Sequence, residues 1–183
     1  MSRYMQTLNN QIQQGVKSWV NEITEPSQSR SGLNGLKISA ALKLVTRFVG
    51  QAIPFATRNG FQVIDFRPGY VKAFIPLKPN KNHFNAMYAG ALFTVAELPG
   101  GIISIFSFDD QYFPVLKDLK MDFLKMAKTD VTVEFEIPAA EIARIEKECE
   151  QNGKCHFVLQ GEVKDADGVI VATSYANYQV RKK

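Results

Sequence analysis

One carboxylate, Glu97, stands inside the most apolar segment of the chain, residues 89–108. An ionised carboxylate among apolar side chains is costly unless it is paired or hydrogen-bonded, so its presence there calls for a reason. Carboxyl groups perturbed in this way are found at catalytic and proton-transfer sites more often than elsewhere. Glu97 is therefore the leading candidate for a functional group.

Small and polar residues recur with Glu97 at spacings of three and four, so they share one face if the segment is helical. Larger apolar residues, such as Leu92 and Val95, fall on other faces and should pack against a sheet. The small face would let a ligand or a partner subunit approach the helix backbone, although plain helix packing also explains it. Its members are Gly90, Thr94, Glu97, Gly101 and Ser104.

The composition indicates one globular domain of ordinary size. The chain has 183 residues, of which 45% are hydrophobic and 22% are charged, close to the averages for soluble domains. Its net charge of +4 is spread along the chain and does not argue for nucleic-acid binding, but it would suit an anionic small-molecule substrate.

The cysteines and histidines give no sign of a metal site. The two cysteines, Cys149 and Cys155, and the two histidines, His83 and His156, show no ligand spacing. The start of the chain has no pattern of a secretory signal, so a reduced, cytoplasmic protein is expected. Residues 89–108 are long enough to cross a membrane, but Glu97 and the residues after it make crossing costly, and no membrane span is expected.

Two helices are predicted before the first strand. Apolar residues at spacings of three and four predict an amphipathic N-terminal helix, and residues 24–35 form a polar loop or linker. A second amphipathic helix should cover residues 36–49. We therefore divide the chain into residues 1–35, the N-terminal helix and linker, and residues 36–183, the main domain. The residues predicted to face the core are Met5, Leu8, Ile12, Val16, Trp19 and Ile23 in the first helix, and Leu36, Leu42, Val45 and Phe48 in the second.

From Phe61 onward, short alternating runs predict five or six antiparallel strands. Leu119, Met121 and Phe123 alternate along one of these strands, and the face that they share should be buried. A short helix is expected at residues 139–151, and residues 165–168 should join the last two strands as a hairpin. A helix that is apolar nearly all round must be covered nearly all round, so the sheet should curl about residues 89–108 in an α+β fold.

The segment before Glu97 resembles the hotdog-fold thioesterases, particularly the phenylacetyl-CoA thioesterase type and a related group of uncharacterised bacterial domains. These proteins typically have an Asn, six residues later a His-Gly-Gly that opens the central helix, and an Asp or Glu nine residues after that His. Asn82, Tyr88, Gly90 and Glu97 take these places here, with Tyr88 in place of the His and Ala89 in place of the first Gly. The resemblance covers about residues 60–181, and residues 121–127 also resemble a strand of the family.

The resemblance implies a hotdog fold, in which an antiparallel sheet wraps around a long central helix, here with extra N-terminal helices. It also implies a homodimer or a dimer of dimers, which agrees with the need of a long curved sheet to cover its edges. The implied activity is metal-independent hydrolysis of an acyl-CoA or a related acyl thioester. No cofactor is expected beyond the coenzyme A part of the substrate.

The resemblance also implies roles for particular residues. Glu97 would act as general base or nucleophile, either two turns along the helix or from the partner subunit, and Asn82 would orient the water or the carbonyl. Backbone N–H groups at the helix start, next to the small Ala89 and Gly90, would polarise the thioester carbonyl. Tyr88 would either donate a hydrogen bond where the His of the family does, or form part of the pocket wall. Thr94, Gly101 and Ala89 are expected to line the substrate site, and Lys125 to meet phosphates of coenzyme A.

Two other functions remain open at this point. A noncatalytic acyl-binding domain with a regulatory role would keep the pocket and lose turnover, as the exchange of His for Tyr88 permits. A hydratase on the same fold is the third reading, but such enzymes usually pair an Asp with a His, and only His83 lies near the helix start.

Overall fold

The computed structural model describes residues 3–25 and 31–183, and within α1 it describes the side chains from Gln14 onward. The described chain has five α-helices, one short 3-10 helix and six strands. The helices are α1 (Arg3–Thr24), α2 (Gly32–Ala52), α3 (Pro54–Arg58), η1 (Lys78–Asn80), α4 (Ala89–Ser107) and α5 (Ala139–Asn152); the strands are β1 (Gln62–Arg67), β2 (Tyr70–Ile75), β3 (Tyr112–Phe123), β4 (Val131–Glu136), β5 (Lys154–Asp165) and β6 (Ile170–Lys182).

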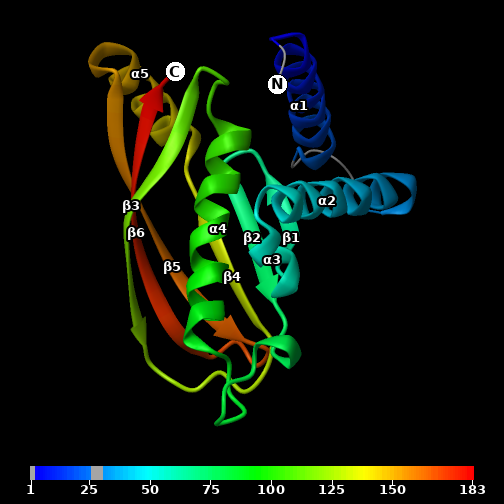
Figure 1. The fold of residues 1–183 in the computed structure, drawn as a ribbon, viewed down its shortest axis with the longest axis vertical. Coiled ribbons are helices and arrows are strands. Elements are labelled where there is room, and N and C mark those ends of the chain that lie inside the picture. The colour runs from blue at the N-terminus through cyan, green and yellow to red at the C-terminus, as the bar shows by residue number, and fades with distance from the viewer. Residues whose placement is uncertain (1–2, 26–30) are drawn as a thin grey trace.

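The six strands form one antiparallel sheet in the order β1-β2-β4-β5-β6-β3. The sheet curves around α4, which lies along its inner face (Figure 1). β5 and β6 form the predicted hairpin, in which the Asp165 carboxylate accepts hydrogen bonds from the backbone N–H groups of Asp167 and Val169 at 3.1 and 2.8 Å. Gly168 has a φ of +77°, which favours glycine in this turn.

α4 is the core helix of the fold. Leu92, Val95, Ile103 and Phe106 are buried under the sheet, as their spacing predicts. The ring of Phe106 meets that of Phe66 edge to face, with centroids 5.1 Å apart. α4 is long and apolar enough to cross a membrane by length and composition, but 67% of the apolar window is buried inside the protein, as expected for a core helix.

One close contact fixes α4 against the sheet. Tyr178 of β6 donates a hydrogen bond from its hydroxyl to the backbone oxygen of Glu97 at 2.8 Å. Its ring stacks on Phe157 and fills the space beside Gly100, so that a Cβ on Gly100 would overlap the Tyr178 ring. Glycine at position 100 is therefore what lets the helix approach β6 this closely.

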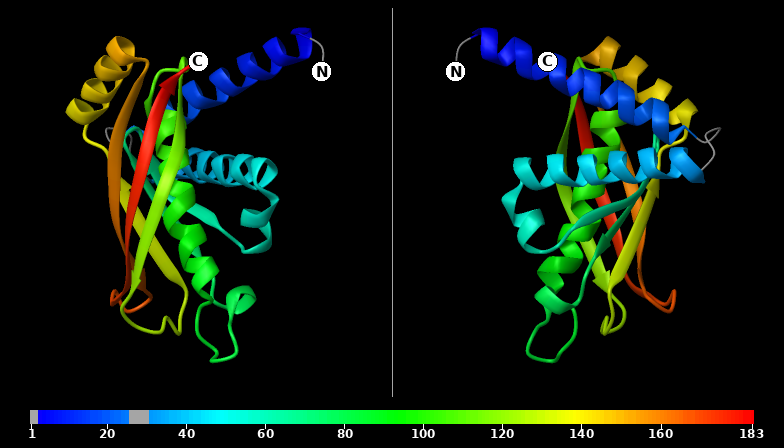
Figure 2. Two further views of the ribbon diagram at one scale, coloured as in Figure 1. Left: turned by 60° about the vertical axis from the view of Figure 1, so that its left-hand side comes forward. Right: turned by 90° about the vertical axis from the view of Figure 1, so that its right-hand side faces the viewer.

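α1 attaches at the C-terminal end of α4, whereas α2 packs against β1, where the Val63 N–H donates to the Thr46 hydroxyl at 2.9 Å. Asn21 of α1 donates to the carbonyl of Phe106 at 3.0 Å, and the Lys17 ammonium donates to the carbonyl of Phe108 at 2.6 Å. Both carbonyls lie at the end of α4, where cations and hydrogen-bond donors are favourable. Both helices lie on the same side of the sheet as α4, and α1 projects from the body of the molecule (Figure 2).

Several predictions of core-facing residues are wrong in detail. Leu36 is 69% exposed, because α2 buries the face that carries Ile38, Ala41, Val45 and Val49, and Leu36 lies on another face. The predictions for Val45, which is buried, and Leu42, which packs partly against the core, are confirmed. Trp19 is also exposed, whereas Val16 and Ile23 pack partly against the core. Met5, Leu8 and Ile12 lie outside the described side chains.

The prediction that Phe123 is buried is also wrong. It is 50% exposed, because β3 is an edge strand and its C-terminal end extends beyond the covered part of the core. Leu119 and Met121 are partly buried and pack against the core as predicted.

The contact between Gly100 and Tyr178 predicts that Gly100→Ala destabilises the protein. We expect the free energy of unfolding to fall by about 1–3 kcal/mol, because the added methyl group forces the ring or the helix to move. Urea unfolding followed by circular dichroism measures the change. Gly101→Ala is the matched control, since a Cβ there meets no atom within 4 Å and should add about 0.5–1 kcal/mol of helix stability. Equal effects of the two substitutions would contradict this account.

Candidate functional site

Glu97 lies at the middle of α4 with its side chain half-buried. Burial raises the pKa of Glu97 above the usual range of a carboxyl group. None of the described residues donates a hydrogen bond to its carboxylate or forms an ion pair with it. An acid with a raised pKa and no partner is able to accept a proton or to attack an electrophile.

The open face of α4 shares Gly90, Glu97 and Gly101 with the predicted face and differs from it at two positions. Thr94 and Ser104 are buried, and their hydroxyls donate to the carbonyls of Gly90 and Gly100 at 2.8 and 2.7 Å. Large apolar residues take their places on the open face. This face consists of Gly90, Phe93, Glu97, Gly101 and Ile105.

Sequence analysis left Phe93 and Ile105 out of this face because it defined the face by small and polar residues. The spacings of four from Phe93 to Glu97, Gly101 and Ile105 follow the same helical rule and would have identified this face. Ile105 is 47% exposed, and the Phe93 ring meets that of Phe123 with centroids 6.0 Å apart. The open face of α4 is therefore apolar on both sides of its one carboxylate.

The start of α4 leaves backbone donors free. Tyr88 is the N-cap residue and its side chain makes no capping hydrogen bond. Its carbonyl accepts from the N–H groups of Ala91 and Leu92 at 2.9 and 3.3 Å. Within the described chain no acceptor faces the N–H groups of Ala89 and Gly90, so they are available to an anionic or carbonyl oxygen. The Tyr88 ring is exposed and lies beside Gly90, where it would meet any added Cβ.

Asn82 organises the loop that leads into α4. Its side-chain oxygen accepts from the N–H groups of Phe84 and Ala86 at 2.9 and 3.2 Å, and its own N–H donates to the carbonyl of Ala86 at 2.8 Å. Asn85 completes this tight loop with a φ of +57°. The side-chain NH₂ of Asn82 has no acceptor among the described residues, which leaves it free to bind a ligand.

A second asparagine, Asn80, was not singled out by the sequence. It is buried, and its side-chain NH₂ donates to the carbonyls of Asn59 and Pro76 at 2.8 and 2.7 Å. Its carbonyl accepts from the N–H of Tyr88 at 2.8 Å. Asn80 thus holds the residue at which α4 begins, and no spacing in the sequence indicated this role.

A hollow of about 340 Å³ lies at the start of α4. Three of the predicted site residues line it: Asn82, Ala89 and Lys125. The remaining walls are mostly apolar and come from the loop before α4, from α4 itself, and from the last residue of β3 and the segment that follows it. They are Ala86, Met87, Leu92, Phe123, Leu124, Met126 and Ala127.

Glu97 does not line this hollow. It lies seven residues beyond Gly90 on the same helix, a rise of about 10 Å at 1.5 Å per residue. A group bound at the N–H groups of Ala89 and Gly90 is therefore too far along the helix axis for the Glu97 of the same chain to attack it. The structure brings Asn82, Ala89 and Lys125 together around the hollow and leaves Glu97 apart from them. Tyr88 and Gly90 flank Ala89 in the chain but do not line the hollow, and Gly101 lies one turn beyond Glu97.

No metal-binding group is formed by the parts of the chain that the structure describes. No three His, Cys, Asp or Glu side chains there lie close enough to hold a metal ion. Cys149 and Cys155 are buried, and burial raises the pKa of both thiols, which makes them poor nucleophiles.

A comparison with protein families shows to which family the chain belongs. Residues 42–180 match the family profile described as "Domain of unknown function (DUF4442)". The chain belongs to this family. A search of curated proteins gave no match.

Solved structures place the DUF4442 chain among hotdog proteins. A Pseudomonas aeruginosa protein of unknown function, described as a probable thioesterase, is 38% identical, with a TM-score of 0.75 over 77% of this chain and 95% of its own. A Chlorobaculum tepidum protein of unknown function is 15% identical, with a TM-score of 0.70 over 79% and 96%. A Haemophilus influenzae thioesterase is 13% identical, with a TM-score of 0.62 over 77% and 90%. The fold is the α+β hotdog fold, and the chain is a member of the hotdog thioesterase superfamily.

The raised pKa of Glu97 predicts how Glu97→Gln changes stability with pH. Below the unfolded-state pKa, both states carry a protonated Glu97 and the substitution should have little effect. As pH rises above that value, the unfolded state ionises first, so the parent protein loses stability until the folded-state pKa is passed. We expect Glu97→Gln to raise the melting temperature at pH 7 and to leave it nearly unchanged at pH 4.

Thermal unfolding at both pH values measures this difference. Glu162→Gln is the matched control, because Glu162 is exposed on β5 and makes only a surface ion pair with Lys164 at 3.1 Å. A gain for Glu97→Gln at pH 4 that equals the gain at pH 7 would contradict a burial-raised pKa.

Proposed function

We propose that this protein hydrolyses an acyl-CoA or a related acyl thioester without a metal ion. The observation that carries the proposal is the half-buried, unpaired Glu97 on the open face of α4, in a hotdog fold shared with thioesterases. The free N–H groups of Ala89 and Gly90 supply the second requirement of acyl transfer, which is a site for the carbonyl oxygen. The net charge of +4 suits an anionic substrate such as a coenzyme A ester.

The site is proposed to lie between two subunits. Glu97 and the hollow beside Asn82 are about 10 Å apart along one helix, so a second copy of the chain must supply the carboxylate. β3 offers the means of association, because it is a twelve-residue edge strand with one side unpaired. A two-fold pairing of β3 with itself gives a homodimer as the minimum unit, with a dimer of dimers as a larger assembly. We expect this assembly in the cytoplasm.

In this arrangement the thioester carbonyl binds at the N–H groups of Ala89 and Gly90, with the NH₂ of Asn82 beside it. Glu97 of the partner subunit either takes a proton from water, which then attacks the carbonyl carbon, or attacks that carbon itself. The carbon–sulfur bond breaks, and the thiolate leaves and takes up a proton. If Glu97 is the nucleophile, water then hydrolyses the acyl-enzyme anhydride to release the acid.

Other residues bind and shape the substrate. Lys125 at the rim of the hollow is placed to meet a phosphate of coenzyme A. Gly101, one turn beyond Glu97, leaves room for an acyl chain to lie on the helix. The Thr94 hydroxyl is held by the carbonyl of Gly90, so we assign Thr94 to the shape of the first turn instead of to substrate contact.

One observation favours a second candidate, a noncatalytic acyl-binding domain with a regulatory role. Tyr88 stands where the resemblance expects a His, and its ring lies beside Gly90. A ring in this position narrows the approach to the free N–H groups. Such a protein would bind an acyl-CoA in the same hollow and release no thiol.

Turnover of acyl-CoA esters tests the proposed reaction. We expect free-thiol release from at least one member of a panel of short, long and aromatic acyl-CoAs. Glu97→Gln should lower kcat by about 10²–10⁴ without any loss of thermal stability, because the general base is lost while the fold is kept. Glu162→Gln should keep full activity.

The pH profile of the parent enzyme adds a second readout. The rate should rise with pH through a midpoint above the usual range of a glutamate, since Glu97 must be ionised to react. Binding of acyl-CoA without thiol release would favour the acyl-binding domain, and equal turnover in the parent and Glu97→Gln would show that Glu97 is not the catalytic group.

The proposed dimer predicts a mass of two chains in solution. Light scattering after gel filtration should give about 41 kDa, twice the 20.5 kDa of one chain. Leu119→Pro places proline within β3, where it perturbs the edge, and should shift the mass toward that of one chain. A monomeric parent would contradict a site shared between subunits.

A further inference from the structure

The outer side of α2 is uncovered within the described chain. α2 lies across the outside of the molecule, on the far side of α4 from β5 and β6 (Figure 2). It buries the side that carries Ile38, Ala41, Val45 and Val49. The opposite positions recur at spacings of three and four, and every one of them is exposed. They are Leu33, Leu36, Ala40, Leu44, Arg47 and Gln51.

Large apolar side chains gather on this outer side. Leu33 is 78% exposed, and Leu36 and Leu44 are exposed as well. Ile53 and Phe55 follow directly after α2 and are also exposed. Single exposed apolar residues are normal on a protein surface, but several of them on one element mark a surface that contacts a partner or a membrane.

The same surface is basic and has no acid of its own. Lys37 and Lys43 flank the exposed row of α2, Arg47 lies within it, and Arg58 follows in the last turn of α3. No Asp or Glu occurs from residue 31 to residue 61. None of these four cations has an ion pair or a side-chain hydrogen bond with a described residue. Their positive charge is therefore not neutralised within the described chain.

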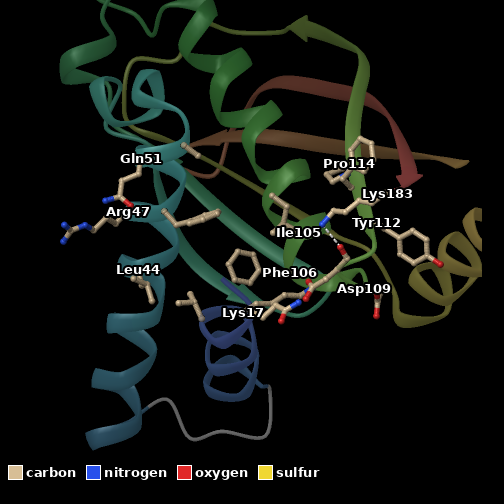
Figure 3. A pocket seen from close by; sticks show the side chains of 16 residues that line it. Lys17, Leu44, Arg47, Gln51, Ile105, Phe106, Asp109, Tyr112, Pro114 and Lys183 are labelled. Carbon is tan, nitrogen blue, oxygen red and sulfur yellow. Dashed lines mark hydrogen bonds and ion pairs between the residues drawn. The ribbon is translucent and has the colours of Figure 1, made fainter. Parts of the chain in front are cut away.

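Arg47 is directed away from the body of the protein. With Leu44 and Gln51 it borders a hollow of about 830 Å³ that lies between α1, α2 and the last turn of α4 (Figure 3). Figure 3 shows the Arg47 side chain pointing away from Ile105 and Phe106, the α4 residues of this hollow. Its guanidinium is thus available to an anionic group that approaches α2 from outside.

An anionic lipid bilayer fits both features of the outer side of α2. Headgroup phosphates attract Lys and Arg side chains at the membrane surface, and apolar side chains enter the boundary beneath the headgroups. Nucleic acid would satisfy the cations, but its phosphate backbone offers no apolar layer to Leu33 and Leu36. A second copy that met this surface with its own α2 would place cations against cations, which is unfavourable.

We propose that the outer side of α2, together with the start of α3, docks on the surface of an anionic phospholipid bilayer. Lys37, Lys43 and Arg47 meet the headgroup phosphates. Leu33 and Leu36 enter the apolar boundary, and no part of the chain crosses the bilayer in this contact. Long acyl chains partition into bilayers, so docking would hold the protein where such chains gather. The inference goes beyond the proposed thioesterase activity and does not depend on it.

Co-sedimentation with lipid vesicles tests this contact. We expect the parent protein to sediment with vesicles of phosphatidylglycerol and phosphatidylcholine, and to bind far more weakly to phosphatidylcholine alone or at high salt. Lys43→Gln/Arg47→Gln should lower the partition coefficient by roughly tenfold to thirtyfold, because each cation near an anionic surface contributes about a factor of five. The matched control is Lys147→Gln/Lys154→Gln, which removes the same charge from exposed positions on α5 and β5. It should change binding by less than about twofold.

A second variant tests the apolar part of the contact. Leu33→Ser/Leu36→Ser keeps the charge and should also weaken binding to the anionic vesicles by about tenfold, because two apolar side chains no longer leave water. Circular dichroism checks that each variant keeps its helices.

The proposal is supported if both α2 variants weaken binding and the control does not. A parent protein that fails to bind anionic vesicles overturns it and leaves this surface to a protein partner. Equal losses in Lys43→Gln/Arg47→Gln and the control also overturn it, since net charge would then explain the binding. A loss in the charge variant without a loss in Leu33→Ser/Leu36→Ser would mean a purely electrostatic contact, as with nucleic acid, and would overturn it too. None of these measurements uses turnover, so vesicle binding and thiol release succeed or fail separately.

Discussion

The need to cover one apolar helix governs this structure. α4 has apolar side chains on almost every face, and exposing them to water would be costly. The sheet meets this need by curving around the helix, which in turn leaves β1 and β3 as free edges. The one face of α4 that the sheet does not reach carries Glu97. The position of the carboxylate and the unpaired edge strand are thus two results of the same geometry.

That geometry also explains the electrostatics of Glu97. The carboxylate is close enough to the core to lose much of its hydration and too far from any cation to recover it, so burial alone raises its pKa. The hydroxyl of Tyr178, which comes from the sheet, donates to the backbone oxygen of Glu97 instead of to the carboxylate. This hydrogen bond fixes the backbone at Glu97. The two carboxylate oxygens have no partner among the described residues, so they remain available to react.

Much of this fold could be predicted because its main signals are periodic. The apolar run of α4, the strand alternation and the turn before β6 each follow from local spacing, and the motif from Asn82 to Glu97 identified the fold family. The exposure of Phe93 follows from its spacing of four to Glu97, but the exposure of Phe123 and Leu36 could not be predicted, because it depends on which helix face packs on the core and on which strand lies at the edge of the sheet. The role of Asn80 could not be predicted either, because it depends on contacts with Asn59 and Pro76, which are distant from α4 in sequence.

The strand order carries a consequence for how the chain folds. β6 is the single partner of β3 in the described chain, and it pairs Phe123 with Ala172, so nearly fifty residues of chain must be made after β3 before that pairing is possible. During synthesis, β3 therefore leaves the ribosome with both of its edges open and its apolar residues uncovered. Contacts of such long sequence separation form late, and strands that wait for them are prone to aggregate. Nascent chains of this protein should depend on chaperones most in the interval between the emergence of β3 and that of β6.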